Sequence, residues 1–128
     1  MPRPIVIASV SPKHDTFPLI VASGEFAVSV LAGDQVAAGQ YFSYPGHKFK
    51  YSVEEFLDVY PSTELPVVRD AIAWLRCEVF DTKDMSDHRL FFARVVAVEP
   101  GRLKEPPLLY SSRLGWRIAG DKAREPGT

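Results

Sequence analysis

Alternating apolar side chains from Leu90 to Val98 predict the most strand-like segment of the chain. Both faces of this segment are apolar except at Arg94, so we expect a central strand that is covered on both sides. The preceding residues Ala71 to Phe80 are also β-rich. The connection Asp81 to Ser86 is short enough for an antiparallel hairpin. If Arg94 is buried, Glu78 on the neighbouring strand is its expected partner.

The N-terminal third alternates strand and helix patterns. Pro4 to Val10 is a β-branched run that predicts a buried strand. A helix is expected over Phe17 to Ser23, with Asp15 or Thr16 as its N-cap and Gly24 as its end.

A second strand and helix pair is expected next. Phe26 to Leu31 predicts a strand, and Gln35 to Phe42 predicts a helix with Asp34 as N-cap. Ser52 to Glu55 has the spacing of a capping box, which predicts a brief helix that ends near Val59.

The C-terminal part is richer in turns. Leu108 to Ser112 predicts a last short strand, and Gly115 to Ile118 a final packed stretch. Gly120 to Thr128 is charged and poor in apolar residues, which is typical of a disordered tail. We expect one domain over residues 1–118 and a disordered tail over residues 119–128.

Composition narrows the classes of function. The chain has 128 residues, of which 46% are hydrophobic, and a net charge of −1 from 15 basic and 16 acidic residues. This balance argues against a nucleic-acid partner, and no apolar run is long enough to span a membrane. The start lacks a secretion signal, and the single Cys77 cannot form an internal disulfide. We expect a cytoplasmic protein in which Cys77 is a small buried residue.

Several common catalytic patterns are absent from the sequence. It has no glycine-rich phosphate loop, no His-Glu-x-x-His, no cysteine pair for zinc and no Gly-x-Ser-x-Gly. No metal site is therefore expected.

A series of segments, in order along the chain, resembles the flavin reductase-like, FMN-binding split-barrel family. The first three are an apolar strand and turn (Val6 to Thr16), a Phe-x-Val-x-Val-Leu strand (Phe26 to Leu31) and a Gln-to-Phe helix (Gln35 to Phe42). The fourth is a Leu-Pro strand ending in Cys (Leu65 to Cys77). The family's Gly-Asp-His turn and the strand after it are matched by Ser86 to Val95. Pro107 to Tyr110 and Gly115-Trp116 complete the series.

The resemblance implies a mainly β fold with flanking helices, a split β-barrel. It also implies the strand-to-helix turn as the phosphate end of a bound flavin, where hydroxyls, a lysine charge and a helix N-terminus would meet an anion. The residues of that turn are Ser9, Ser11, Lys13, His14 and Thr16. The alternative reading is an ordinary solvated turn.

The resemblance also points to catalytic and accessory residues. His88, with Asp87 beside it, could donate or accept near a flavin ring or a nicotinamide amide; otherwise the pair is a half-exposed turn. Lys48 lies in a loop that often contributes a basic residue near the flavin. Trp116, with Tyr110, could stack on a ring or could merely cover a core edge.

The implied function is that of an FMN-binding oxidoreductase, either an NAD(P)H:flavin reductase or a small flavin electron carrier, with FMN or FAD as cofactor. Family members normally carry a Thr/Asn/Ser strand segment before the first strand seen here, and this sequence starts at Met1 without it. Either the start has been placed too far downstream, or the barrel is shortened at its N-terminus. A missing strand leaves an open sheet edge, so we expect a homodimer. The alternatives are a non-catalytic dimeric scaffold without flavin and a barrel that binds another ligand, such as haem or a deazaflavin.

Overall fold

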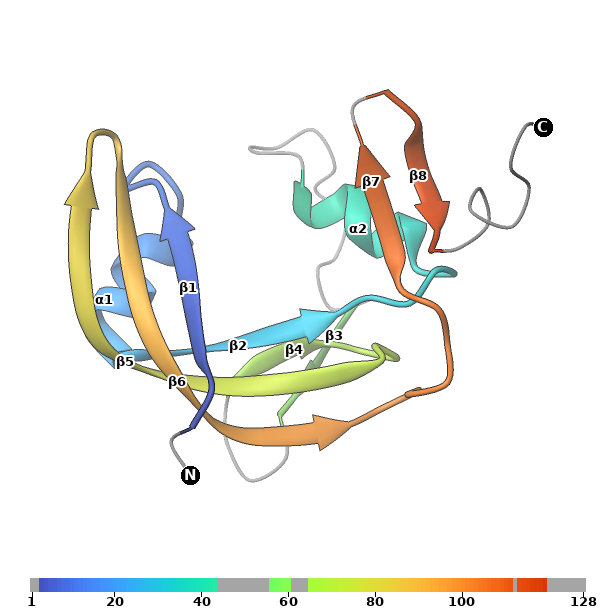
Figure 1. Cartoon of the computed structure of the whole chain (residues 1–128), viewed down its shortest axis with the longest axis horizontal. Coiled ribbons are helices and arrows are strands. Elements are labelled where there is room, and N and C mark those ends of the chain that lie inside the picture. Colours follow the sequence, from blue (N-terminus) through green and yellow to red (C-terminus); the bar gives the residue numbers. More distant parts are fainter. Residues whose placement is uncertain (1–2, 44–55, 61–64, 112, 120–128) are drawn as a thin grey trace. The chain divides into compact units, whose positions relative to one another are not determined.

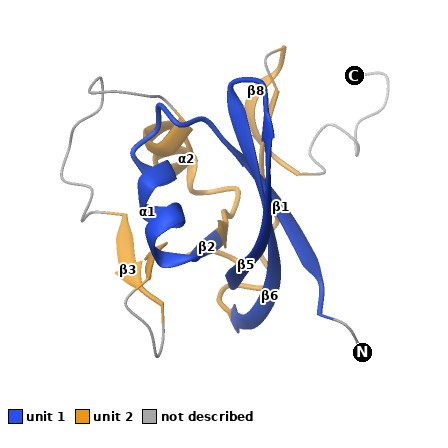
Figure 2. Ribbon diagram, turned by 90° about the vertical axis from the view of Figure 1, so that its left-hand side faces the viewer, with its two compact units in different colours: residues 1–28, 75–99 blue, residues 29–74, 100–128 orange. Residues whose placement is uncertain are grey.

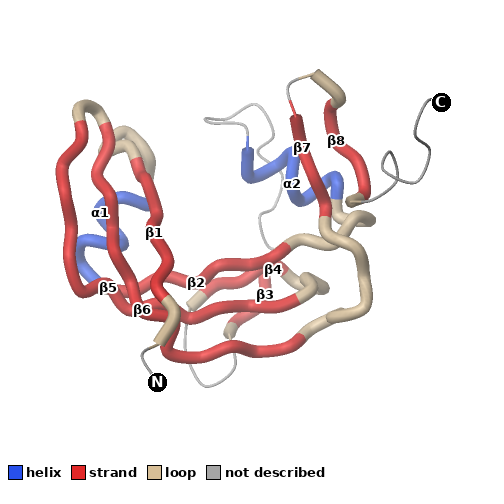
Figure 3. Tube along the Cα trace, viewed as in Figure 1, coloured by secondary structure: helices blue, strands red, loops and turns tan. Residues whose placement is uncertain are grey.

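Strands predominate in the part of the chain that the structure describes (Figure 3). This computed structural model describes residues 3–43, 56–60, 65–111 and 113–119. The chain divides into two compact units, each made of two stretches (Figure 2). Unit 1 comprises residues 1–28 and 75–99, and unit 2 comprises residues 29–74 and 100–128.

A four-stranded sheet built mainly from unit 1 has the order β1-β6-β5-β2 (Figure 1). Its strands are β1 (Ile5–Val10), β6 (His88–Pro100), β5 (Ala73–Met85) and β2 (Glu25–Val30). Helix α1 (Thr16–Ser23) follows β1. The predicted hairpin is present, and its second strand lies at the centre of the sheet, as the alternating pattern indicated.

Strand β1 lies at an edge of the sheet and is only half covered. It pairs antiparallel with β6, with Val6 opposite Ala93 and Ala8 opposite Phe91. The side chains of Ile5 and Ile7 on its other face are 58% and 56% exposed. The prediction of a buried first strand was therefore wrong, because edge strands are covered on fewer sides than central ones. The prediction that β6 is covered on both faces was also wrong, since Val98 is 59% exposed.

The core of unit 1 lies on one face of this sheet. Cys77, Ala93 and Val95 form its buried centre, and partly buried apolar side chains from β1, β2 and β5 pack around them. Phe17 of α1 meets Phe91 edge to face, with ring centroids 5.7 Å apart. Burial raises the pKa of the Cys77 thiol, so it stays protonated at neutral pH. The expectation of a small buried residue at Cys77 is confirmed.

The opposite face carries charged side chains among apolar ones. The Arg94 guanidinium lies 3.9 Å from the centroid of the Phe80 ring. Glu78 instead approaches Arg76, with 3.6 Å between Oε2 and Nη2. The expected Arg94–Glu78 pair is therefore replaced by a cation–π contact, which suits a cation that remains exposed to water.

The hairpin between β5 and β6 is tighter than the sequence predicted. Strand β5 runs to Met85 and β6 begins at His88, so only Ser86 and Asp87 form the turn, not Asp81 to Ser86. Ser86 has φ of 57°, in the left-handed region that favours glycine.

Helix α1 ends as predicted but begins differently. Gly24 caps its end with φ of 71°, and its N–H donates to the Ile20 carbonyl at 2.8 Å. Asp15 occupies the N-cap position, yet its side chain makes no hydrogen bond to the first turn. The N-cap position of Asp15 was therefore predicted correctly, but its side chain does not form the capping hydrogen bond.

Unit 2 contains a helix and two small hairpins. Helix α2 (Val36–Ser43) matches the second predicted helix. Strands β3 (Leu57–Val59) and β4 (Pro66–Val68) pair antiparallel, as do β7 (Leu108–Ser111) and β8 (Gly115–Ile118). The predicted helix ending near Val59 is wrong at that end, where β3 is extended. Its start at Ser52 to Glu55, and the tail from Gly120, lie outside the described residues.

Helix α2 packs closely against the β7–β8 hairpin. A Cβ at Gly39 would lie 2.8 Å from Trp116 Cζ3 and 2.9 Å from Leu108 Cδ2. A Cβ at Gly33 would lie 2.6 Å from Ile118 Cγ1. Any larger residue at these two positions would force the side chains of Ile118, Trp116 and Leu108 to shift, because such distances are shorter than van der Waals separation.

One arginine joins three segments of unit 2. Arg102 donates from Nη1 and Nη2 to the Asp34 carboxylate at 2.8 and 2.7 Å, and from Nε to the Asp70 carbonyl at 2.8 Å. Asp34 therefore binds Arg102 and lies one residue before the N-cap position, since α2 begins at Val36. Gln35 occupies that position, and its Oε1 accepts from the Ala32 N–H at 2.9 Å.

Candidate cofactor-binding site

The turn between β1 and α1 is held by its own hydrogen bonds. The His14 N–H donates to the Ser11 carbonyl at 3.0 Å, and the Phe17 N–H donates to the His14 carbonyl at 3.0 Å. Ser11 is buried, and its Oγ accepts from the Lys13 N–H at 3.3 Å. The side chains of Lys13 and His14 are exposed. The turn thus has a fixed backbone and presents two basic side chains to solvent.

The N-terminus of α1 suits an anion. The Asp15 side chain makes no capping hydrogen bond, so it leaves the backbone N–H groups at this end without a side-chain partner from the N-cap. In the sequence, Lys13 lies shortly before α1 and Thr16 is its first residue, so both belong to the N-terminal end of this helix. This donor set fits a phosphate group. The nearby Asp15 carboxylate would have to point away from it.

The predicted Asp87–His88 pair is present. His88 Nδ1 lies 2.9 Å from Asp87 Oδ1, and the two side chains are 43% and 82% exposed. A carboxylate can only accept a hydrogen bond, so Nδ1 carries the proton and Nε2 remains available to a ligand. The hydrogen bond from His88 lowers the pKa of the Asp87 carboxyl below its usual value. Asp87 thus sets which imidazole nitrogen faces outward.

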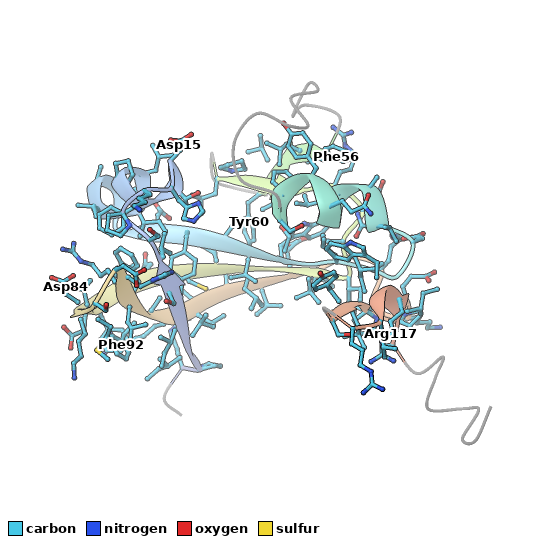
Figure 4. The ribbon with its side chains drawn as sticks, turned by 90° about the horizontal axis from the view of Figure 1, so that it is seen from above. Asp15, Phe56, Tyr60, Asp84, Phe92 and Arg117 are labelled. Atoms are coloured by element: carbon cyan, nitrogen blue, oxygen red, sulfur yellow. The ribbon has the colours of Figure 1, made fainter. Side chains whose placement is uncertain are left out.

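Strand pairing brings these two segments to the same end of unit 1. Val10, the last residue of β1, lies opposite Arg89, and Ser9 lies opposite Leu90. Strand alternation places His88 on the face of Leu90 and Phe92, and Arg89 on the face of Phe91 and α1. In Figure 4, Asp15 and Phe92 mark these two sides of the sheet.

Sequence reasoning missed Arg89. Its Nε donates to Asp84 Oδ1 at 2.6 Å, and its Cζ lies 5.1 Å from the centroid of the Phe17 ring. The signal was a basic residue directly after the Asp-His pair, at the mouth of an otherwise apolar strand. Its meaning depends on Phe17, which is 72 positions away and which only the fold brings close.

Two other predicted residues belong to unit 2. Lys48 lies outside the described residues. Trp116 belongs to unit 2, where its ring centroid is 4.8 Å from that of Tyr110 and its edge lies against Gly39. These contacts support the packing role for Trp116.

Two further features bear on the kind of site. Within the described ranges, no three His, Cys, Asp or Glu side chains are grouped so that they could hold a metal ion. None of the described helices has the length and apolar character needed to cross a membrane.

Residues 1–114 match the sequence model of the flavin reductase like domain. The chain is 34% identical over 103 residues to an NADH-dependent flavin reductase of Pseudomonas fluorescens, an alignment covering 74% of this chain and 55% of the relative. It is 29% identical over 110 residues to the NADH:riboflavin 5′-phosphate oxidoreductase of Streptomyces pristinaespiralis, covering 86% and 61%.

The fold also resembles solved structures. The flavin reductase of the styrene monooxygenase from Pseudomonas putida S12 superposes with a TM-score of 0.68 and 29% identity, covering 83% of this chain and 65% of that one. The mainly β split-barrel fold inferred from the resemblance is confirmed. The chain spans little more than half the length of the curated relatives named above.

Proposed function

The chain belongs to the flavin reductase-like family, and on that premise we propose that it is a flavin-dependent oxidoreductase that takes electrons from NADH. The observation that supports this proposal is the pairing of Val10 with Arg89, because it brings the β1–α1 turn and the Asp87–His88 turn to the same end of the sheet. Phosphate-binding groups and an oriented imidazole are the parts that a nucleotide cofactor requires. FMN is the proposed flavin, because its single phosphate matches one turn.

Each segment has a distinct role in the proposed site. Lys13, His14 and the hydroxyls of Ser11 and Thr16 hold the phosphate, and Ser9, which lies opposite Leu90, contributes a hydroxyl on the His88 face. His88 presents Nε2 to the ring or to the nicotinamide amide, and Asp87 keeps Nδ1 protonated. The bound flavin supplies the hydride-accepting chemistry that no side chain provides.

An absorbance spectrum of the purified protein tests the proposal. After incubation with FMN and desalting, flavin bands should co-elute with the protein, and NADH should bleach them anaerobically. NADPH serves as the comparison, with NADH expected to react faster. A protein that retains no FMN would contradict the proposal and favour the non-catalytic scaffold.

His88 has a testable share in turnover. His88→Ala should lower NADH oxidation about 10- to 100-fold, because a positioned proton donor or acceptor contributes on this order. FMN affinity should change less than twofold. Lys13→Glu should mainly weaken FMN binding, because it places a negative charge near the phosphate. Unchanged turnover in His88→Ala would remove the residue from the mechanism.

We further propose that two copies of the chain associate. The support is the edge position of β1, together with the exposed apolar side chains of Ile5, Ile7 and Val98 on one face of the sheet. Light scattering coupled to size exclusion should give the mass of a dimer. The mass of a single chain would contradict this.

A cytoplasmic location is also proposed, on the basis of the single buried thiol of Cys77. Cell fractionation with an antibody against the protein checks it, and recovery in a secreted or membrane fraction would contradict it.

A further inference from the structure

The Arg89 guanidinium is held from three elements of unit 1. Its own strand, β6, places it on the α1 face of the sheet. Asp84 on β5 accepts from its Nε at 2.6 Å, and the Phe17 ring on α1 lies 5.1 Å from its Cζ. The Arg89 side chain is 31% exposed. An arginine fixed in this way loses little conformational freedom on binding a ligand.

The outer edge of this guanidinium has donors to spare. Asp84 occupies only Nε, and no residue in the described ranges accepts a hydrogen bond from Nη1 or Nη2. Those two nitrogens form the fork that binds two oxygens of a phosphate or carboxylate at once. The contact with Phe17 is made by the ring beneath the guanidinium carbon, 5.1 Å from Cζ to the ring centroid, and takes no hydrogen bond from Nη1 or Nη2.

A short chain of contacts connects this fork to the β1–α1 turn. The Phe17 ring that supports Arg89 belongs to the residue whose N–H donates to the His14 carbonyl. The His14 N–H donates in turn to the Ser11 carbonyl. Arg89 also lies opposite Val10, the residue before Ser11. A third basic side chain therefore joins Lys13 and His14 at the N-terminus of α1.

We propose that Arg89 binds the phosphate of the flavin and makes this site select a phosphorylated flavin over riboflavin. The inference rests on the proposed function and assigns a specificity-determining residue within it. Two charge-assisted hydrogen bonds to phosphate oxygens have no counterpart in riboflavin, which carries a hydroxyl there. Arg89 acts on binding and takes no part in proton transfer.

Titration of flavin fluorescence with the full chain tests the proposal, using FMN and riboflavin at one fixed ionic strength. Arg89→Gln should weaken FMN binding about tenfold, since a hydrogen bond to a charged group contributes on this order. Riboflavin affinity should change less than twofold. Arg89→Lys keeps the charge but not the fork, so its loss should be intermediate. Circular dichroism confirms that each variant is folded.

Arg94→Gln is the matched control. Arg94 lies on the same strand and contacts a phenylalanine ring in the same way, 3.9 Å from the Phe80 centroid, but it lies on the opposite face. Its replacement should leave the preference for FMN over riboflavin unchanged. An equal loss in Arg94→Gln and Arg89→Gln would indicate a general effect of charge and overturn the proposal.

Asp84→Asn gives an independent check. The amide oxygen can still accept from Arg89 Nε, while one negative charge near the phosphate is removed. FMN binding should tighten about twofold at low salt, and this gain should vanish at high salt. Weaker FMN binding in this variant would contradict the inference.

The outcomes separate this inference from the proposed function. If FMN and riboflavin bind but Arg89→Gln keeps their ratio, the inference is wrong and the proposed function stands. If neither flavin binds, inorganic pyrophosphate is the probe. Thermal stabilisation of the native chain by pyrophosphate, lost in Arg89→Gln, would retain the anion site while the proposed function fails; no stabilisation would overturn both.

Discussion

Arg89 in unit 1 and Arg102 in unit 2 each bind an aspartate, yet the two guanidinium groups differ in how many N–H donors they leave without a protein acceptor in the described part of the chain. Arg102 gives both Nη atoms to Asp34 and its Nε to the Asp70 carbonyl. Arg89 gives only Nε, to Asp84. Their side chains are similarly accessible, at 35% and 31% exposed. The difference therefore lies in hydrogen bonding and not in burial.

This difference separates a structural arginine from one that can bind a ligand. Among the residues that the structure describes, Arg102 uses three of its five N–H donors to join the start of α2 to two connections of unit 2, whereas Arg89 uses one of its five. Spare donors in a fixed orientation remain available to a ligand. Counting unused donors on a held guanidinium is thus more informative than the presence of an ion pair.

Gly101→Ala should destabilise the fold most, because it disturbs the backbone next to Arg102. A Cβ at Gly101 would collide with the Ala71 carbonyl oxygen, which also accepts the Arg102 N–H at 3.0 Å. Backbone atoms cannot move aside, so we expect a loss of about 2–3 kcal/mol in the free energy of unfolding. Urea denaturation measures it. The FMN to riboflavin preference should not change.

Gly24→Ala is the control for that substitution. Gly24 has φ of 71° but no atom within 4 Å of an added Cβ. It should cost only about 1 kcal/mol, from backbone strain alone. An equal loss at both glycines would show that the Ala71 carbonyl is not a steric barrier.

A smaller effect is expected from the two non-glycine residues with left-handed backbones, Asp70 in unit 2 and Ser86 in unit 1, with φ of 64° and 57°. Ser86→Gly should raise the free energy of unfolding by up to about 1 kcal/mol, because it relieves strain at the turn before Asp87. Asp70→Gly should gain less, since aspartate tolerates this conformation better than serine. A larger gain at Asp70 would reverse the ranking of the two turns.

The smallest effect concerns acid stability. The hydrogen bond from Arg102 lowers the pKa of Asp34 from its ordinary 3.8. A carboxyl with a lowered pKa in the folded state stabilises the fold above pH 3.8, and this contribution disappears as pH falls through the folded-state pKa. Asp34→Asn should therefore flatten the dependence of the melting temperature on pH below about 4.

Asp87 offers the same test in unit 1, since the hydrogen bond from His88 lowers its pKa. Asp87→Asn should also flatten the acid limb. Both carboxylates are exposed, so each change should be slight. A profile unchanged in Asp34→Asn would mean that the Arg102 contact contributes no pH-dependent stability.

Local signals in the sequence were sufficient for most elements. Gly24 ends α1 because a left-handed residue there favours glycine, and the alternation in Leu90 to Val98 identified the central strand. The predictions failed where contacts with distant segments determine the burial or the hydrogen bonding of a residue. Pro4 to Val10 is apolar on both faces, yet its position at the edge leaves Ile5 and Ile7 exposed. Asp34 resembled a helix cap, but Arg102 competes for its carboxylate.

The candidate site shows the same division. Asp87 and His88 are adjacent in sequence, so their pairing could be predicted, and the turn from Ser11 to Thr16 was recognisable as a polar connection before a helix. Arg89 could not be assigned, because its aspartate and its aromatic support lie on two other elements.

By itself the sequence determined most of the strand and helix segments, the family and the chemical types of residue at the two turns, because these depend on local periodicity and short motifs. Only the tertiary structure decided which face of β6 each residue occupies and which donors are already used. Those properties depend on strand register and on contacts between distant segments. A guanidinium is the same group in Arg89 and Arg102, and its surroundings alone give it a different role.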